Sequence, residues 1–422
     1  MASPSGPTPG PVAGANPLLN PALQENPYGL YAMLREGSPV FRPPIPVETG
    51  AGVFLLTRHA DVEAVLRDPE HRFSVQRRES DVFRLFADRL PVALLEGPIG
   101  SRSMLLQDPP EHTRLRGLVS RAFTPRRVAE LEPRVEALVD ELLTDAFARG
   151  EVDWIHDVAE PLPAVVIAEL LGVPAEDHRT FRGWSSRLID ALPAFGQEGA
   201  TEDVAALVET LAGYLREQIA RRRDDPRDDL LSALIEARDA QDALSEEELV
   251  ATALLLLLAG HETTTNLIGN GLLALLRHPE QLDWLRADPA GRIANAVEEL
   301  LRFDSPVQGT VRVAMEDVEI GGQAIAKGAL VVCGIGAANR DPAVHPDPDR
   351  LDLARDPIRH LSFGFGTHFC LGASLARLEG RAVFRALAER AASVEATSEK
   401  LEYRANPVLR GLRSLPVRLV EA

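Results

Sequence analysis

Cysteine is scarce in this chain, and long apolar runs are missing. Only Cys333 and Cys370 occur among its 422 residues. Two cysteines cannot build the disulfide framework of a secreted protein, so we expect a reducing compartment. The longest apolar run, Val250–Gly260, contains one hydroxyl at Thr252. It is far shorter than the roughly 20 residues that span a membrane. The sequence therefore predicts a soluble, cytoplasmic protein without a membrane anchor.

Positive charge is also in deficit, with 45 basic residues against 63 acidic ones and a net charge of −18. Nucleic acid and anionic membrane surfaces carry charge of the same sign, so neither is expected as a partner. Residues 1–17 have no charged side chain and lack the basic and apolar regions of a signal peptide. We expect residues 1–26 to form a flexible arm ahead of a single domain, 27–422.

Helical patterns dominate the chain from Pro109 onward and are separated by proline and glycine. They cover 110–122, 125–149, 158–171, 175–190, 203–223, 228–239, 245–277, 279–287 and 290–303. Strand-like segments occur at 39–41 and 52–57 and within 310–338. Residues 339–369 form a long coil, which a compact domain rarely keeps without a function. The predicted fold class is mainly α with small β-sheets at one side.

The most informative segment is 363–372, with the sequence FGFGTHFCLG, which places Cys370 directly before a helical pattern. A thiolate there meets the positive end of the helix dipole, which lowers its pKa and improves it as a ligand. Gly366 allows a tight turn that aims the sulfur, and Gly372 allows a bulky partner to approach closely. The alternative is a buried structural cysteine, which is common for free thiols.

The pattern F-x-x-G-x-H-x-C-x-G resembles the heme-ligand loop of cytochrome P450 monooxygenases. That resemblance implies the fold of this family, a triangular prism of helices around a buried heme b. It also implies that Cys370 is the axial thiolate of the iron, with Phe363 packed beside the sulfur to shield it from water.

The helical pattern over 245–277 begins with a capping box formed by Ser245 and Glu248. Its centre contains A-G-H-E-T, which is poor helix material, so we expect a kink or π-bulge there. The segment resembles the A-G-x-[DE]-T motif of the same family. The resemblance implies that Thr263 and Glu262 deliver protons to dioxygen. Alternatively, the Thr263 hydroxyl bonds to the preceding turn and Glu262 pairs with an arginine.

Glu299 and Arg302 lie three residues apart, on one face of a helix. The spacing alone is compatible with an ordinary surface pair. The resemblance implies the buried E-x-x-R pair of the family, which braces the cysteine loop through an arginine of the coil. Arg350 is our candidate for that third member, although Leu351 departs from the phenylalanine usual beside it.

Four cationic or donor side chains come from distant segments: His112, Arg116, Arg312 and His368. Each alone would be read as a surface residue. The resemblance implies that together they bind the heme propionates, since arginine and histidine suit carboxylates. The segment 112–127 carries five arginines and no acid, and the default interpretation of this basic patch is a solvated helix face. The resemblance implies that the patch lies on the thiolate side of the heme, where it would attract an acidic electron carrier.

The resemblance places the substrate beside Leu255, Leu258, Ala259 and Val307, with Ala259 also against the heme. These residues are apolar, so we expect an apolar or mixed-polarity small molecule. Phe83, Phe86, Phe181, Trp184 and Phe195 are candidates for a cap, although core packing explains each equally well. No flavin or nicotinamide motif is evident.

The resemblance implies hydroxylation or epoxidation with O₂. Electrons would come from a ferredoxin and its NAD(P)H-dependent reductase. The resemblance further implies a bacterial enzyme of secondary metabolism. A peroxide-driven hydroxylase and a non-catalytic heme sensor remain as alternatives on the same fold. A helical protein without a cofactor is a third.

Overall fold

The fold is known from a computed structural model that describes residues 25–43, 52–87, 95–191, 200–237, 243–406 and 408–422. Most of the predicted arm, 1–24, therefore lies outside the described residues. The helices are α2 (Tyr28–Gly37), α3 (His59–Arg67), α4 (Asp81–Ala87), α6 (Glu111–Ala122), α7 (Pro125–Glu130), α8 (Glu132–Arg149), α9 (Pro161–Leu171), α10 (His178–Ala191), α11 (Ala200–Asp224), α12 (Leu230–Glu236), α13 (Glu246–Arg277), α14 (Pro279–Arg286), α15 (Pro289–Phe303), α16 (Ile335–Ala338) and α17 (Ala373–Arg390).

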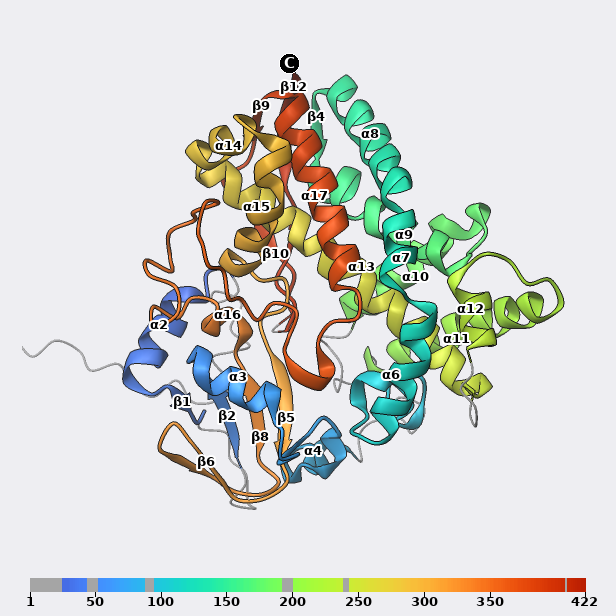
Figure 1. Cartoon of the computed structure of the whole chain (residues 1–422), viewed down its shortest axis with the longest axis vertical. Coiled ribbons are helices and arrows are strands. Elements are labelled where there is room, and N and C mark those ends of the chain that lie inside the picture. Colours follow the sequence, from blue (N-terminus) through green and yellow to red (C-terminus); the bar gives the residue numbers. More distant parts are fainter. Residues whose placement is uncertain (1–24, 44–51, 88–94, 192–199, 238–242, 407) are drawn as a thin grey trace, which may run out of the picture.

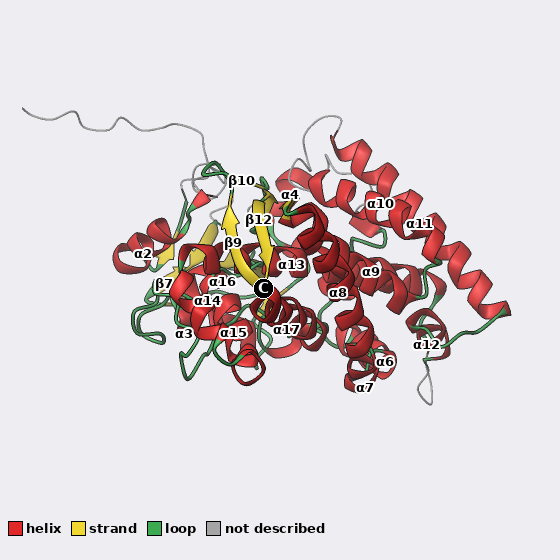
Figure 2. Cartoon of the chain, turned by 90° about the horizontal axis from the view of Figure 1, so that it is seen from above, coloured by secondary structure: helices red, strands yellow, loops and turns green. Residues whose placement is uncertain are grey.

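The strands lie mainly in two regions, one in the lower part of Figure 1 and one near the C-terminus at its top, and Figure 2 shows helices on both sides of them. They are β1 (Val40–Phe41), β2 (Val53–Leu56), β3 (Phe73–Ser74), β4 (Glu151–Asp153), β5 (Thr310–Ala314), β6 (Val318–Ile320), β7 (Gln323–Ile325), β8 (Leu330–Cys333), β9 (Ala391–Ala396), β10 (Glu402–Tyr403), β11 (Leu412–Ser414) and β12 (Pro416–Glu421). The largest sheet has the order β1-β2-β8-β5-β3, in which β2 and β8 run parallel. The predicted fold class, mainly helical with small sheets, is confirmed, but the sheets do not all lie at one side.

The helix α13 crosses the core and organises the helices around it. Its N-terminus has the predicted capping box: Glu248 N–H donates to Ser245 Oγ over 3.3 Å, and Ser245 N–H donates to Glu248 Oε2 over 2.8 Å. Such a cap stabilises a helix by about 1 kcal/mol. Glu248 also accepts a hydrogen bond from Arg114 of α6, so the same carboxylate joins two helices.

The expected break in the middle of α13 is not there. The helix is continuous from Glu246 to Arg277. Thr263 and Thr265 instead donate their hydroxyls to the carbonyls of Ala259 and His261, over 2.7 and 3.1 Å. These back-bonds satisfy the threonine hydroxyls inside the helix without opening its backbone ladder. The π-helical turn of this fold lies elsewhere, at η4 (Ile155–Ala159).

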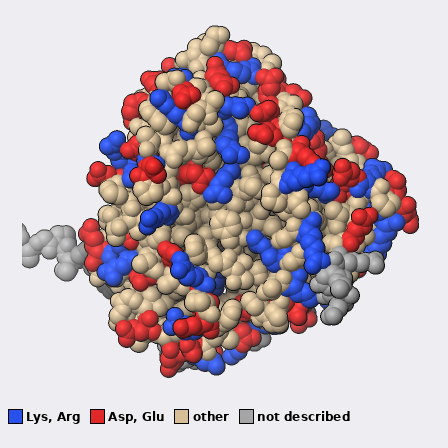
Figure 3. Space-filling model, viewed as in Figure 1, with Lys and Arg blue, Asp and Glu red and all other residues tan. Residues whose placement is uncertain are grey.

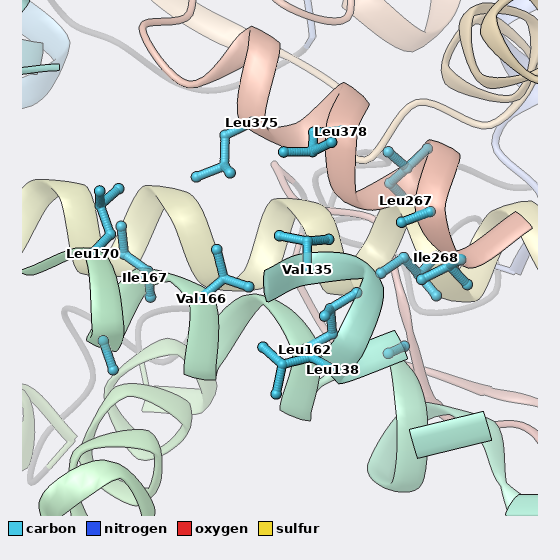
Figure 4. Packing of buried hydrophobic residues seen from close by; sticks show 14 of the residues in the cluster. Val135, Leu138, Leu162, Val166, Ile167, Leu170, Leu267, Ile268, Leu375 and Leu378 are labelled. Atoms are coloured by element: carbon cyan, nitrogen blue, oxygen red, sulfur yellow. The ribbon is translucent and has the colours of Figure 1, made fainter. Parts of the chain in front are cut away.

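The main core lies where α8, α9 and α17 pack around α13 (Figure 4). Its side chains come from all four helices, including Leu138 of α8, Ile167 of α9, Ile268 of α13 and Leu378 of α17. Close helix contacts in this region depend on small residues. A Cβ atom on Gly271 would lie 2.4 Å from Cζ of Phe384, a fully buried ring of α17.

We predict that Gly271→Ala destabilises the protein by about 1–3 kcal/mol, because the added methyl overpacks the α13–α17 contact. The measurement is the midpoint of urea unfolding. Gly213→Ala in α11 is the matched control, since nothing lies within 4 Å of its Cβ position. That change should leave stability unchanged or raise it by about 0.5–1 kcal/mol through helix propensity. Equal midpoints for the two variants would contradict the packing argument.

Candidate functional site

Cys370 lies just before α17, and its loop is built around two glycines with left-handed backbone. Gly364 and Gly366 have φ of 71° and 69°. A Cβ atom on Gly366 would lie 2.5 Å from the carbonyl oxygen of Leu66, so the loop passes too close to α3 for any side chain at this position. The amide of Cys370 donates to the carbonyl of Phe363 over 2.8 Å. This bond closes the loop and fixes the direction of the sulfur.

The electrostatics of Cys370 differ from the sequence prediction. Its side chain is solvent-accessible, yet protein surrounds the sulfur closely enough that burial is the largest influence and raises the thiol's pKa. The Gly372 amide and the charges of Arg116 and Arg377 act in the opposite direction without overcoming it. The position before a helix therefore does not by itself yield a thiolate. A bound metal cation would, because a coordinating thiol is deprotonated outright.

The four predicted propionate ligands come together. The rings of His112 and His368 are 4.1 Å apart between centroids. Burial, with the charge of Arg116 prominent among its neighbours, lowers the pKa of His112 to about 4. Burial together with His112, Arg312 and Arg116 lowers the pKa of His368 to about 3. Both imidazoles are therefore neutral at pH 7, and the positive charge of the cluster lies on Arg116 and Arg312. An anion placed here would pair with these charges and favour protonation of the histidines.

Two details of this cluster fit a carboxylate ligand. Nδ1 of His112 is buried and has no hydrogen-bond partner among the described residues. Arg312 is buried as well, and donates only to Thr310 Oγ1 and the Val311 carbonyl within the part of the chain that the structure describes. Buried donors of this kind ordinarily have partners. The residues present therefore fit the propionate groups of a heme.

One face of α13 completes the site from the other side. Residues 249–275 of α13 are almost all buried, yet Ala259 is exposed and Leu255, Leu258 and Thr263 are half-buried. Glu262 is 4% exposed. Val307 is half-buried and forms an isolated antiparallel bridge with Leu409.

The predicted pair of Glu299 and Arg302 forms in the core. Two hydrogen bonds of 2.6 and 2.7 Å join the carboxylate to the guanidinium, and both side chains are fully buried. Arg302 also donates to the carbonyls of Asn339, Pro348 and Arg350. Its charge therefore gathers the long coil that leads to the cysteine loop.

The third member of this network is Arg355, and the prediction of Arg350 is wrong. The Arg350 side chain is 65% exposed and pairs with Asp352, contributing only its carbonyl to Arg302. Arg355 Nε instead donates to Glu299 Oε1 over 3.2 Å, with its side chain 10% exposed. Its other nitrogens donate to the carbonyls of Pro346, Asp347 and Arg350. The coil brings the side chain of Arg355, and not that of Arg350, back to Glu299. The spacing of residues along the sequence does not reveal which of the two arginines reaches this carboxylate.

A second ion pair under the cysteine loop was missed by the sequence reasoning. Arg377 binds Glu298 with two hydrogen bonds of 2.6 and 2.8 Å, and His360 lies 3.0 Å from the same carboxylate. Burial opposes ionisation, but these bonds lower the pKa of Glu298 to about 2. The guanidinium of Arg377 lies 4.4 Å from the ring centroid of Phe363. The Arg377 guanidinium therefore packs on the Phe363 ring and helps to hold it in position. Glu298 sits next to Glu299 in the E-x-x-R helix, the one signal that could have pointed to it.

The predicted cap residues divide between core and undescribed parts. Phe181 and Trp184 pack on Tyr214, with ring centroids 5.8 and 5.6 Å apart, so both belong to the α10–α11 contact. Phe83 is half-buried in α4. Phe195 and the side chain of Phe86 lie outside the described residues.

A separate cavity of about 820 Å³ lies between α2, the end of α13 and the segment 399–410. One of its acidic residues, Asp304, accepts from Tyr28 Oη over 2.6 Å and from Arg410 Nε over 2.7 Å. None of the predicted site residues lines it. Arg410, which lines this cavity, donates its amide to the Pro306 carbonyl, beside the bridge of Val307 and Leu409.

Comparison with known proteins identifies the class of this site. A family model described as Cytochrome P450 matches residues 187–289 and 293–390. The chain is 45% identical over 406 residues to a vitamin D(3) 25-hydroxylase of Pseudonocardia autotrophica, covering 95% of this chain and 96% of that protein. It is 42% identical to the cytochrome P450 monooxygenase PikC of Streptomyces venezuelae, covering 93% and 91%. The solved cytochrome P450 PksS of Bacillus subtilis 168 superposes with a TM-score of 0.86, at 38% identity, over 96% of this chain and all of that one.

The chain belongs to the cytochrome P450 family, and its fold is the fold of that family. It is a monooxygenase of the group that includes bacterial hydroxylases of secondary metabolism. The family's cofactor is heme held by a cysteine thiolate. Among the described residues, no helix is long and apolar enough to cross a membrane.

We predict that Arg355→Gln destabilises the protein by about 3–5 kcal/mol, because it removes a partner from a buried carboxylate. Arg350→Gln should change the free energy of unfolding by less than about 0.5 kcal/mol, since its side chain is exposed. Urea unfolding and retention of bound heme during purification are the readouts. The reverse order of the two variants would restore the role assigned from sequence to Arg350.

Acid should weaken the coil through His345. Burial and the charges of Arg302, His59, Arg355 and His360 lower its pKa to about 3. The unfolded chain, with a pKa near 6.5, binds this proton more tightly, so stability is complete above about pH 6.5 and is lost as the pH falls toward 3. Between pH 6.5 and 5 this histidine alone costs about 2 kcal/mol. Unfolding experiments at each pH should show a shallower decline for His345→Asn, and identical slopes would contradict the prediction.

Proposed function

We propose that this protein inserts one oxygen atom of O₂ into an apolar or mixed-polarity small organic substrate, by hydroxylation or epoxidation at a heme b. The observation that carries the proposal is the meeting of Cys370 with the cluster of His112, Arg116, Arg312 and His368. The charge of Arg116 influences the pKa of both the Cys370 thiol and His368, which supports a single site that contains the sulfur and the cluster. The heme supplies the oxidising chemistry when bound, and the protein positions, protonates and excludes water.

The residues divide the work of holding the cofactor. Cys370 would bind the iron, and the four cationic side chains would bind the propionates. Among the described residues there is no group of three or more His, Cys, Asp or Glu that could hold a metal ion. Iron held by Cys370 would therefore take its other ligands from a porphyrin. Ala259 is exposed in α13 and Gly372 has open space at its Cβ position, so both allow a flat group to approach closely.

Thr263 and Glu262 are proposed to deliver protons to bound dioxygen. The hydroxyl of Thr263 donates to the Ala259 carbonyl over 2.7 Å, which leaves its lone pairs for a further donor such as water. Glu262, the residue before Thr263 in α13, is buried, and a carboxylate there can exchange a proton with a nearby group. The back-bond that competed with this role in the sequence is therefore compatible with it.

Leu255, Leu258, Ala259 and Val307 are proposed to contact the substrate. They form the accessible apolar part of α13 and of the wall made by Val307 and Leu409. Such a surface favours an apolar body. The enzyme would work in the cytoplasm on a small molecule.

Electrons are proposed to come from a ferredoxin and its NAD(P)H-dependent reductase. Figure 3 shows basic side chains around the uncharged centre of the face seen in Figure 1, where the cysteine loop lies. The segment 112–127 contributes less free charge than its sequence indicates. Arg126 pairs with Glu130 and Arg127 with Asp228, while Arg116 lies near Cys370. An acidic carrier would meet a ring of mostly paired arginines.

The decisive experiment is the absorption spectrum of the reduced protein under carbon monoxide. We expect the strongly red-shifted Soret band of thiolate-ligated heme, and its loss in Cys370→Ser. The Cys333→Ser variant should keep the band, because Cys333 is buried in β8, outside the cysteine loop. Heme without the shifted band would favour a sensor, and no heme after addition of hemin would overturn the proposal.

Thr263→Ala should keep heme and the shifted band but divert reductant into hydrogen peroxide. The ratio of product to NAD(P)H consumed is expected to fall by about tenfold or more, because a positioned proton donor contributes at least that much. Unchanged coupling would remove Thr263 from proton delivery. Product formed equally well from peroxide alone, with no response to the ferredoxin system, would favour the peroxide-driven alternative.

A further inference from the structure

The carboxylate of Glu298 binds both flanks of the cysteine loop, the segment 363–372. Before the loop, Nε2 of His360 lies 3.0 Å from Glu298 Oε2. After the loop, Arg377 of α17 donates two hydrogen bonds of 2.6 and 2.8 Å to the same carboxylate. Cys370 lies between these two flanks in the sequence. One side chain of α15 therefore closes the part of the chain that carries the sulfur.

The flank before the loop is held by a directed chain of hydrogen bonds. The Ser362 N–H donates to Nδ1 of His360 over 3.2 Å, so the imidazole proton is on Nε2 and is donated to Glu298. The Ser362 hydroxyl donates to the carbonyl of Leu301 over 2.8 Å. Because Glu298 and Leu301 lie about one turn apart on α15, this flank is attached to that helix at two neighbouring points.

Arg377 connects this ion pair to Cys370 through Phe363. The guanidinium carbon of Arg377 lies 4.4 Å from the ring centroid of Phe363, and the His360 ring lies 5.8 Å from the same ring. The carbonyl of Phe363 accepts the N–H of Cys370 over 2.8 Å. A guanidinium held by two parallel hydrogen bonds presents a fixed planar face to an aromatic ring. A displacement of Arg377 would therefore reach Cys370 through a single intervening residue.

Glu298 differs from its neighbour Glu299 in burial and in partners. Glu299 is fully buried and binds Arg302 and Arg355, which gather the long coil. The side chains of Glu298 and Arg377 are 28% and 31% exposed, so water can solvate either one when its partner is removed. Loss of this pair is therefore expected to leave the fold intact. Its position and exposure suit a local role at the loop.

We propose that Glu298 and Arg377 are positioning residues for Cys370, because their ion pair attaches both flanks of the cysteine loop to α15 and so fixes the direction of the sulfur. Residues that orient a metal ligand without touching the metal control how well that ligand binds. The inference rests on the proposed function, since it takes Cys370 as the axial ligand of the heme iron. It assigns Arg377 to the loop itself and not to the surface that receives the electron carrier.

The test follows the reduced holoenzyme under carbon monoxide as its shifted Soret band converts into an unshifted one. Arg377→Met removes the ion pair but keeps an unbranched side chain over Phe363. We expect it to accelerate the conversion by about tenfold, an effect typical of residues that orient metal ligands. Arg385→Met is the matched control, because Arg385 lies on the same helix, is 36% exposed and pairs with Glu136 of α8 over 2.6 Å. This variant should match the wild type.

Two further variants separate the position of Arg377 from its charge. Glu298→Gln keeps the charge of Arg377 but removes its anchor, and is expected to accelerate the conversion to a similar extent. Combining it with Arg377→Met should add little, because both changes break one ion pair. Arg377→Lys should restore part of the stability of the band, since an ammonium still reaches the carboxylate but cannot present a planar face to Phe363. Urea unfolding should give midpoints close to that of the wild type for these variants.

Wild-type conversion rates in Arg377→Met and Glu298→Gln would overturn the inference. A weaker response to ferredoxin with an unchanged band would assign Arg377 to carrier binding and would also overturn it. Equal acceleration in Arg385→Met, or loss of the band only in step with a lower urea midpoint, would assign the pair a general structural role, with the same consequence. Failure of the proposed function shows separately, because the wild type itself would then lack the shifted band.

Discussion

The buried ion pair of Glu299 and Arg302 is the interaction on which the rest of the structure depends. A fully buried charge pair is stabilising only if its remaining donors and acceptors are satisfied. Here the guanidinium takes carbonyls from three points of the coil, and the carboxylate takes Arg355 and the Asp352 amide. The coil has little regular structure to hold it, so these bonds set its path. That path in turn delivers the cysteine loop to the start of α17.

The site combines a thiol whose ionisation is unfavourable with an excess of positive charge. Burial raises the pKa of Cys370, and burial together with the neighbouring charges lowers the pKa of His112 and His368. Both features are unfavourable for the protein alone, and both are relieved by one ligand that has a cationic metal at its centre and carboxylates at its edge. The protein is therefore complementary in charge to a metalloporphyrin, which deepens the case for Cys370 beyond the spacing of a motif.

Local patterns predicted what local contacts determine. The capping box of Ser245 and Glu248 and the pair of Glu299 and Arg302 formed as expected, because each involves residues within one or two turns of a helix. Arg355 and Arg377 were not found, because their partners depend on how distant segments return to the core. The strand β12 pairs with β9 and, across a long stretch of the chain, with β4, and no sequence pattern indicated these strands. The prediction of a break in α13 was wrong, because the hydroxyls of Thr263 and Thr265 bond to carbonyls within a continuous helix.

The Glu248 carboxylate, which caps α13 and binds Arg114, has a mechanical consequence. It fixes the axial position of the central helix relative to α6, the helix that carries His112 and Arg116. If α13 moved along its axis, the hydrogen bond between Glu248 and Arg114 would move α6 in the same direction. The two helices of the proposed site, α6 with its proposed propionate ligands and α13 with its proposed substrate contacts, are thereby held in position relative to each other by a hydrogen bond outside the site.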